Sequence, residues 1–256
     1  MKKLLALSLT LVLTMSMVVG CGKDNKQEEK TSAQLEGKSL MVYCGAGMKE
    51  PFQEIADTFS KETGCDVKVT YGNAGQIQTQ INSSKEGDMF IAGSSEELKP
   101  VKDSISNSTD LVKHIPVIAV QKGNPKGIKE IKDLAGNVEV LVGDPKATPI
   151  GKIAHKIFEK EGIKDDVKIA AATPTAPQMA TSLAAGEADA AIVWKENVKG
   201  DDVEIAEVEG MDKYIKTVPA ASLKTTKDKD TLKAFEEFLQ SKKAQEIWTK
   251  YGYELV

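Results

Sequence analysis

The segment LMVYCGAGMKEPFQEIADTFSKETGCDVKVTY, residues 40–71, decides the fold of this chain. A short apolar run at 40–44 is typical of a buried strand. A turn of small residues at 45–47 then leads into a helical pattern that Gly64 ends. Apolar residues recur in that pattern at the spacing of one helix face: Phe52, Ile55, Ala56 and Phe59. A second apolar run at 67–71 completes a strand–helix–strand unit, which predicts parallel strands.

Strand and helix signals alternate through the rest of the chain. Short apolar runs that predict strands occupy residues 89–92, 115–120, 138–142, 190–194 and 219–223. Helical spacing occurs at residues 77–81, 150–158, 179–183 and 231–251. Thr148 and Thr175 suit the N-cap positions of two of these helices, because a side-chain oxygen there can accept from a free backbone N–H. The alternation predicts an α/β fold.

Four junctions between a strand and a helix are rich in small residues: 45–48, 72–76, 93–95 and 173–177. Ligands of open α/β sheets bind beyond the carboxyl ends of the strands, where helix N-termini present free N–H groups to an anion. Ordinary turn chemistry is the alternative interpretation of each glycine. The occurrence of four such junctions in one chain, together with the N-terminal export signal described next, favours a binding cleft.

The N-terminus has the layout of an export signal. Lys2 and Lys3 precede an apolar run at 4–17, and Val-Val-Gly-Cys follows at 18–21. This resembles a bacterial lipoprotein signal, in which Cys21 carries the lipid and begins the mature chain. An uncut membrane anchor is the alternative, but the run is shorter than the ~20 apolar residues that span a bilayer. We predict a signal peptide at 1–20, a flexible stalk at 21–39, and a location on the outer face of the cell membrane.

Charge and cysteine content exclude some functions. The chain has 34 basic residues, all of them Lys, against 38 acidic residues. Without Arg, the chain has no planar guanidinium group that could form bidentate hydrogen bonds to a phosphate or a guanine. Nucleic acid binding is therefore not expected. Cys44 and Cys65 lie at opposite ends of neighbouring parallel strands, ~10 Å or more apart by strand rise. We therefore expect two buried free thiols rather than a disulfide.

The order and spacing of several motifs resemble one family. They are FSKETG at 59–64, GNAG at 72–75, GDMFI at 87–91, DPKATPIG at 144–151, LAAGEAD at 183–189 and AIVW at 191–194. Together they make the chain similar to type II periplasmic solute-binding proteins, nearest to the molybdate- and tungstate-binding receptors of ABC transporters. The resemblance covers nearly everything from Leu40 onward.

The resemblance implies a two-lobed periplasmic-binding-protein type II fold, in which each lobe is a mainly parallel sheet flanked by helices. Lobe one would hold residues 40–118 and 220–256, and lobe two residues 119–219, with two crossing strands between them. It further implies a monomer without cofactor, catalytic residues or structural metal, which closes on an oxyanion and delivers it to a membrane permease.

The resemblance also implies a set of ligand-binding residues: Ala46, Gly47, Met48, Asn73, Ala74, Gly75, Gly93, Ser94, Thr175, Ala176 and Trp194. Gly47 and Ala74 stand where molybdate receptors place serine hydroxyls, and Trp194 stands where they place a tyrosine. Asn73, Gln76, Ser94, Ser95 and Thr175 can supply replacement donors. Molybdate or tungstate is the favoured ligand, and another anion or a small polar solute remains the alternative.

Other interpretations compete at single residues. Cys44 and Met48 flank the first turn, where a soft-metal site is possible but packing is favoured. His114 and His155 lack zinc-site spacing, and the tyrosines are too scattered to suggest an iron receptor. An enzyme would need Cys44 as an exposed nucleophile with a lowered pKa. A ligand sensor of the same fold is a third possibility.

Two further predictions concern packing: Asp88 and Asp189 are structural, and Trp194 is a lid or core residue.

Overall fold

The computed structural model describes residues 35–146 and 148–256. The predicted signal peptide, Cys21 and most of the predicted stalk therefore lie outside the described residues. Among the described residues, no helix combines the length and the apolar character needed to cross a membrane.

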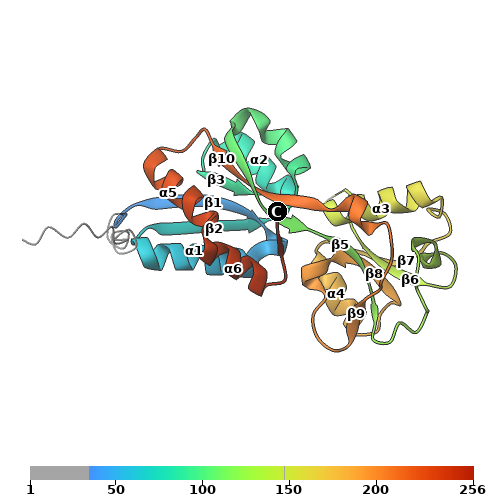
Figure 1. Ribbon diagram of the computed structural model, residues 1–256. Coiled ribbons are helices and arrows are strands. Elements are labelled where there is room, and N and C mark those ends of the chain that lie inside the picture. The colour runs from blue at the N-terminus through green and yellow to red at the C-terminus, as the bar shows by residue number, and fades with distance from the viewer. Residues whose placement is uncertain (1–34, 147) are drawn as a thin grey trace, which may run out of the picture.

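The chain forms two lobes, each built on one sheet (Figure 1). The sheet of lobe one has the order β11-β4-β10-β3-β1-β2. Its strands are β1 (Ser39–Gly45), β2 (Asp66–Gly72), β3 (Met89–Ile91), β4 (Ile105–His114), β10 (Lys216–Leu223) and β11 (Glu254–Leu255). The helices of this lobe are α1 (Lys49–Thr63), α2 (Ala74–Ser84), the 3-10 segment η2 (Ser95–Ser104), α5 (Lys229–Leu239) and α6 (Lys242–Lys250).

Lobe two is built from the middle of the chain, and its sheet has the order β7-β6-β8-β5-β9. Its strands are β5 (Pro116–Gln121), β6 (Glu139–Gly143), β7 (Lys168–Thr173), β8 (Ala190–Trp194) and β9 (Val203–Ile205). Its helices are α3 (Pro149–Glu161) and α4 (Ala176–Ala184), with short 3-10 segments at Ile131–Leu134, Lys195–Asn197 and Met211–Tyr214. The two-lobed α/β fold is therefore confirmed. Both sheets are mixed, because β1–β3 and β6–β8 run parallel while the crossing strands pair antiparallel.

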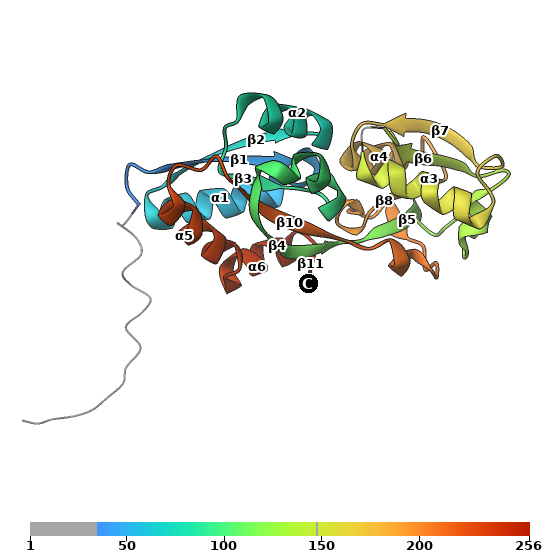
Figure 2. The same cartoon turned by 90° about the horizontal axis from the view of Figure 1, so that it is seen from above.

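Two chain crossings join the lobes, as the view from above shows (Figure 2). The first lies at Ile115, the only residue between β4 and β5, and the second lies at Ile215, just before β10. The chain therefore passes from one sheet to the other a few residues before the predicted lobe boundaries at 118 and 219. The chain passes between the lobes over very few residues at these two crossings, which are called the hinge below.

Lobe one packs its helices through an aromatic cluster. Phe59 of α1 lies 4.9 Å from Phe235 of α5 between ring centroids, and Phe52 lies 6.5 Å from Trp248 of α6. The C-terminal helices thus cover α1, which fixes the turn that follows β1. Leu35 also packs on this cluster and its N–H donates to the Thr63 carbonyl, so lobe one begins before the predicted stalk boundary at 39.

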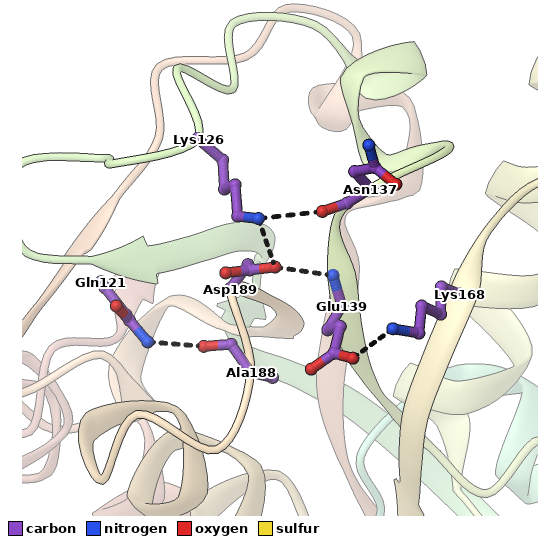
Figure 3. A network of polar contacts seen from close by, with 7 residues as sticks. All are labelled: Gln121, Lys126, Asn137, Glu139, Lys168, Ala188 and Asp189. Atoms are coloured by element: carbon purple, nitrogen blue, oxygen red, sulfur yellow. Dashed lines mark hydrogen bonds and ion pairs between the residues drawn. The ribbon is translucent and has the colours of Figure 1, made fainter.

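Asp88 and Asp189 play equivalent roles at strand starts in the two lobes. Asp88 accepts from the Met41 N–H at 2.8 Å, and Asp189 accepts from the Glu139 N–H at 2.9 Å. Figure 3 shows the second of these, where Lys126 also pairs with Asp189 at 3.3 Å. Each carboxylate ties two parallel strands together at the end remote from the interlobe cleft, which agrees with the predicted structural role.

The C-terminal helical segment differs from the prediction. One helix was expected over residues 231–251, but α5 ends at Leu239 and α6 begins at Lys242. Ser241 causes the break, because its hydroxyl oxygen accepts from the Ala244 N–H and so caps a new helix.

Candidate functional site

A cavity of about 260 Å³ lies between the lobes, at the carboxyl ends of the lobe-one strands. The turns after β1, β2 and β3 line it from one side, and the N-termini of α3 and α4 line it from the other. Its lining comprises Gly45, Ala46, Gly47, Met48, Gly72, Asn73, Ala74, Gln76, Gly93, Glu97, His114, Thr148, Pro149, Ile150, Pro174, Thr175, Ala176 and Trp194. Among the residues that the structure describes, no Lys belongs to this lining.

At the helix N-termini around the cavity, capping side chains accept hydrogen bonds from some of the backbone N–H groups. The number of N–H groups that remain available to a ligand differs from one helix to the next. At α2, Asn73 Oδ1 accepts from the Gln76 N–H and Gln76 Oε1 accepts from the Asn73 N–H. This capping box leaves the N–H groups of Ala74 and Gly75 at the first turn. In the part of the chain that the structure describes, no side chain caps the 3-10 turn that begins at Ala46. The first and second turns can therefore present backbone donors to an anion.

Hydroxyl groups on the lobe-two side are partly occupied. Thr148 Oγ1 donates to the Asp144 carbonyl at 2.9 Å and accepts from the Gly151 N–H at 3.1 Å. Thr175 Oγ1 accepts from the Gln178 N–H at 3.4 Å, which leaves its own hydrogen to point elsewhere. Thr175 therefore keeps a donor for a ligand while holding α4 in place.

The third turn is occupied by a carboxylate of the chain itself. Glu97 Oε2 accepts from the Gly93 N–H at 2.8 Å. The Glu97 side chain is half-buried, and this burial raises the pKa of its carboxyl above the usual value, although the Gly93 bond acts in the opposite direction. The donor at Gly93 is therefore engaged before any ligand arrives.

A buried hydrogen-bonded chain runs from this turn into the hinge. The Gly93 carbonyl lies 2.9 Å from His114 Nδ1 and can only accept, so Nδ1 carries a hydrogen. His114 Nε2 lies 2.8 Å from Glu196 Oε1, and a second proton must lie between these atoms. Trp194 stacks on the imidazole with a centroid distance of 3.6 Å. Trp194 is thus a core residue of the hinge that also faces the cavity.

A second cavity of about 300 Å³ adjoins the first and shares Ala74, Glu97 and Pro149 with it. Four lysines line it: Lys146, Lys152, Lys156 and Lys216. Lys216 pairs with Glu96 at 2.5 Å. The predicted site residues Gly75 and Ser94 line this second cavity rather than the first.

The thiol of Cys44 is not placed for catalysis. Its side chain is fully buried in the core of lobe one, and this burial raises the pKa of the Cys44 thiol well above its usual value. A nucleophile needs the opposite shift. Cys44 and Cys65 are both free, which agrees with the prediction. Within residues 35–146 and 148–256, no group of three His, Cys, Asp or Glu side chains is placed to hold a metal ion.

The structure brings most of the predicted site residues to one place. Nine of them line the first cavity: Ala46, Gly47, Met48, Asn73, Ala74, Gly93, Thr175, Ala176 and Trp194. Their role in ligand binding stays a prediction. Sequence reasoning missed Glu97 and His114 as members of the site. No local pattern distinguishes Glu97 from its charged neighbours Glu96 and Lys99.

Comparison with known proteins identifies the family. A Haemophilus influenzae protein described as a binding protein is 36% identical over 170 residues, 64% of this chain and 69% of that one. The molybdate-binding protein ModA of Rhodobacter capsulatus is 29% identical over 224 residues, 84% of this chain and 87% of that one. The solved substrate-binding domain attributed to a molybdenum ABC transporter of Clostridium difficile is 25% identical, with a TM-score of 0.69 over 85% of this chain and 99% of that one. The family model described as bacterial extracellular solute-binding protein matches residues 40–254, and the chain belongs to that family.

Proposed function

We propose that this protein is the receptor of an ABC importer, which binds a tetrahedral oxyanion between its lobes and delivers it to a membrane permease. Molybdate and tungstate are the first candidates, because the relatives reported above include a molybdate-binding protein. The proposal includes attachment to the outer face of the membrane through a lipid on Cys21. Mass spectrometry of the exported chain tests that attachment, since Cys21→Ala would leave the chain without the lipid mass.

One observation supports an oxyanion most strongly: turns and helix N-termini from both lobes meet at a cavity that no Lys within residues 35–146 and 148–256 lines. A fully deprotonated oxyanion only accepts hydrogen bonds, so it needs several N–H and O–H donors rather than a single countercharge. The first two turns and the start of α4 provide such donors. Because they come from both lobes, an anion that bridges them would stabilise a closed form.

A second candidate ligand is a small organic anion. The cavity lined by four lysines adjoins the first cavity, and the two share part of their lining. A ligand with an oxyanion head and a further acidic group could place the head at the helix N-termini and the acidic group near Lys152 or Lys156. With an inorganic oxyanion bound in the first cavity, water would fill this second cavity.

A thermal-shift panel tests the proposal. It would contain molybdate, tungstate, sulfate, phosphate, thiosulfate and a small organic phosphate. A ligand at ~100 times its dissociation constant should add ~2.7 kcal/mol to the free energy of unfolding. For a domain of this size that corresponds to a rise in Tm of roughly 5–10 °C. A panel in which no anion raises Tm would contradict the proposal.

Matched variants at Gly47 show whether the response comes from the cleft. A Cβ at Gly47 would meet no atom within 4 Å, so new side chains fit there. Gly47→Ser adds a hydroxyl donor and should tighten oxyanion binding by ~1.5–3 kcal/mol. Gly47→Asp adds a carboxylate of similar size and should abolish binding while leaving the unliganded Tm nearly unchanged. Equal responses from the two variants would place binding elsewhere.

A further inference from the structure

The third turn of the cleft differs from the others in its chemistry. The first two turns leave backbone donors at the cavity, but the N–H of Gly93 is bonded to Glu97 at 2.8 Å. Glu97 belongs to the lining of both the oxyanion cavity and the lysine-lined cavity. A carboxylate at this position adds negative charge and hydrogen-bond acceptors to a site whose other features favour an anion.

An ionised carboxylate interacts differently with two kinds of oxyanion, those that carry a hydrogen and those that do not. An oxyanion without hydrogens, such as sulfate or molybdate near neutral pH, can only accept, so it meets charge repulsion and no donor at Glu97. An oxyanion that keeps a hydrogen, such as hydrogen phosphate, can donate that hydrogen to the carboxylate. A protonated Glu97 would itself donate and would suit the first kind.

Building on the proposed oxyanion receptor, we propose that Glu97 is its specificity-determining residue. The carboxylate favours oxyanions that bring a hydrogen-bond donor, and oxyanions without hydrogens bind only when Glu97 takes up a proton. Affinity for sulfate or molybdate should therefore fall by up to about tenfold for each pH unit above the pKa of free Glu97. The affinity for hydrogen phosphate should not fall in this way as pH rises.

The groups around Glu97 act on its pKa in both directions, and burial is the largest of these effects. Burial raises the pKa of its carboxyl, and Glu96 on the same segment acts in the same direction. The Gly93 N–H, His114 of β4 and Lys152 of α3 act in the opposite direction. From β10, Lys216 also lines the second cavity, but it is paired with Glu96. The side chain that α2 presents there, Gln78, is uncharged.

Calorimetric titration of the full chain tests the proposal directly. Sulfate and molybdate would be titrated between about pH 6 and 8.5, in buffers of different ionisation enthalpy, so that protons taken up on binding are counted. The wild type should take up close to one proton per anion at the upper end of this range. Glu97→Gln should take up none, because its amide donates without titrating, and should bind sulfate at least about tenfold more tightly at high pH.

Phosphate and a neighbouring variant provide the comparison. Glu97→Gln should raise the ratio of sulfate affinity to phosphate affinity. Glu96→Gln removes a charge one residue away that does not touch Gly93, and it should keep the proton uptake of the wild type. The wild-type proton count tests the proposal even if Glu97→Gln fails to fold.

The remaining outcomes separate this inference from the proposed function. Binding of sulfate or molybdate without proton uptake in the wild type would overturn the role of Glu97 and leave the oxyanion receptor standing. Unchanged uptake in folded Glu97→Gln would do the same. If no oxyanion binds to wild type or variant, although each unfolds cooperatively, both the inference and the proposed function fail.

Discussion

At the residue scale, Asp228 gives the clearest dependence on pH. It accepts from the Thr231 N–H as the N-cap of α5 and pairs with Lys38 at 2.7 Å. Chiefly because of the hydrogen bond from Lys38, the pKa of Asp228 is lowered to about 2. Since the unfolded chain then binds the proton more readily, Asp228 stabilises the fold at neutral pH, and this contribution is lost as pH falls from ~4 to ~2.

The variant Asp228→Asn isolates that charge, because asparagine caps helices as well as aspartate does. The variant should be less stable than wild type at neutral pH by at most about 1 kcal/mol, because the pair with Lys38 is partly exposed. Urea unfolding should show this difference shrinking to zero near pH 2. A difference that is independent of pH would contradict the pKa of Asp228.

His114 should be the most sensitive polar residue of the hinge. It is buried and bonded to both the Gly93 carbonyl and Glu196. Removing the imidazole leaves the buried Glu196 carboxyl without its partner, so His114→Ala should cost about 3–5 kcal/mol in urea unfolding. The other histidine, half-buried His155 on α3, serves as control, and His155→Ala should cost under about 1 kcal/mol. Similar losses for both variants would contradict the account of the hinge.

At the scale of elements, α3 depends on a glycine for its position at the cleft. A Cβ on Gly151 would collide with the Gly143 carbonyl oxygen and lie 2.6 Å from the backbone of Asp144. Gly151→Ala must therefore push the first turn of α3 away from β6, at a cost of about 1–3 kcal/mol in unfolding free energy. Gly47→Ala, which meets no atom within 4 Å, should leave stability nearly unchanged.

The helix break at Ser241 offers a second test at this scale. Its hydroxyl caps α6, so Ser241→Ala should lower the unfolding free energy by about 1 kcal/mol. Ser106→Ala removes a hydroxyl that bonds to the Ser222 carbonyl but caps no helix. A loss at Ser241 no larger than at Ser106 would argue against the cap as the cause of the break.

Sequence patterns predicted the buried strands well and the polar ones poorly. β8 is wholly buried and β1 is buried at four of its seven residues, so their apolar runs stand out in the sequence. β4 (Ile105–His114) was missed because its first half is largely exposed and polar, and it is held by pairing with β10 instead of by apolar burial. The pairing partners are more than a hundred residues apart in sequence, which local patterns cannot reveal.

The candidate site was predictable where it depends on small residues at turns. Gly47, Ala74 and Ala176 could be placed because they follow strands or begin helices. Glu97 could not, since the sequence makes it one of several charged residues at the start of a helical segment. Its importance arises from the fold, which turns its carboxylate back onto the Gly93 N–H. The pairing of His114 with Glu196 likewise depends on the crossing of the lobes.

At the scale of the whole molecule, the two short crossings predict a hinged receptor. The first crossing is Ile115 alone, and the second lies at Ile215. An anion held by donors from both lobes should favour a more closed arrangement. Small-angle X-ray scattering should show a smaller radius of gyration with a saturating oxyanion in wild type. The same anion should cause no change in Gly47→Asp, and a change in that variant would place closure outside the cleft.

In the whole molecule, we expect an oxyanion to bind where the helix N-termini of both lobes meet. Crystals grown with tungstate below neutral pH test it most directly, because tungsten can be located by its anomalous scattering. We expect one strong peak in the first cavity, near the N–H groups of Gly47, Ala74 and Ala176. A peak among Lys146, Lys152 and Lys156, or no peak between the lobes, would contradict it.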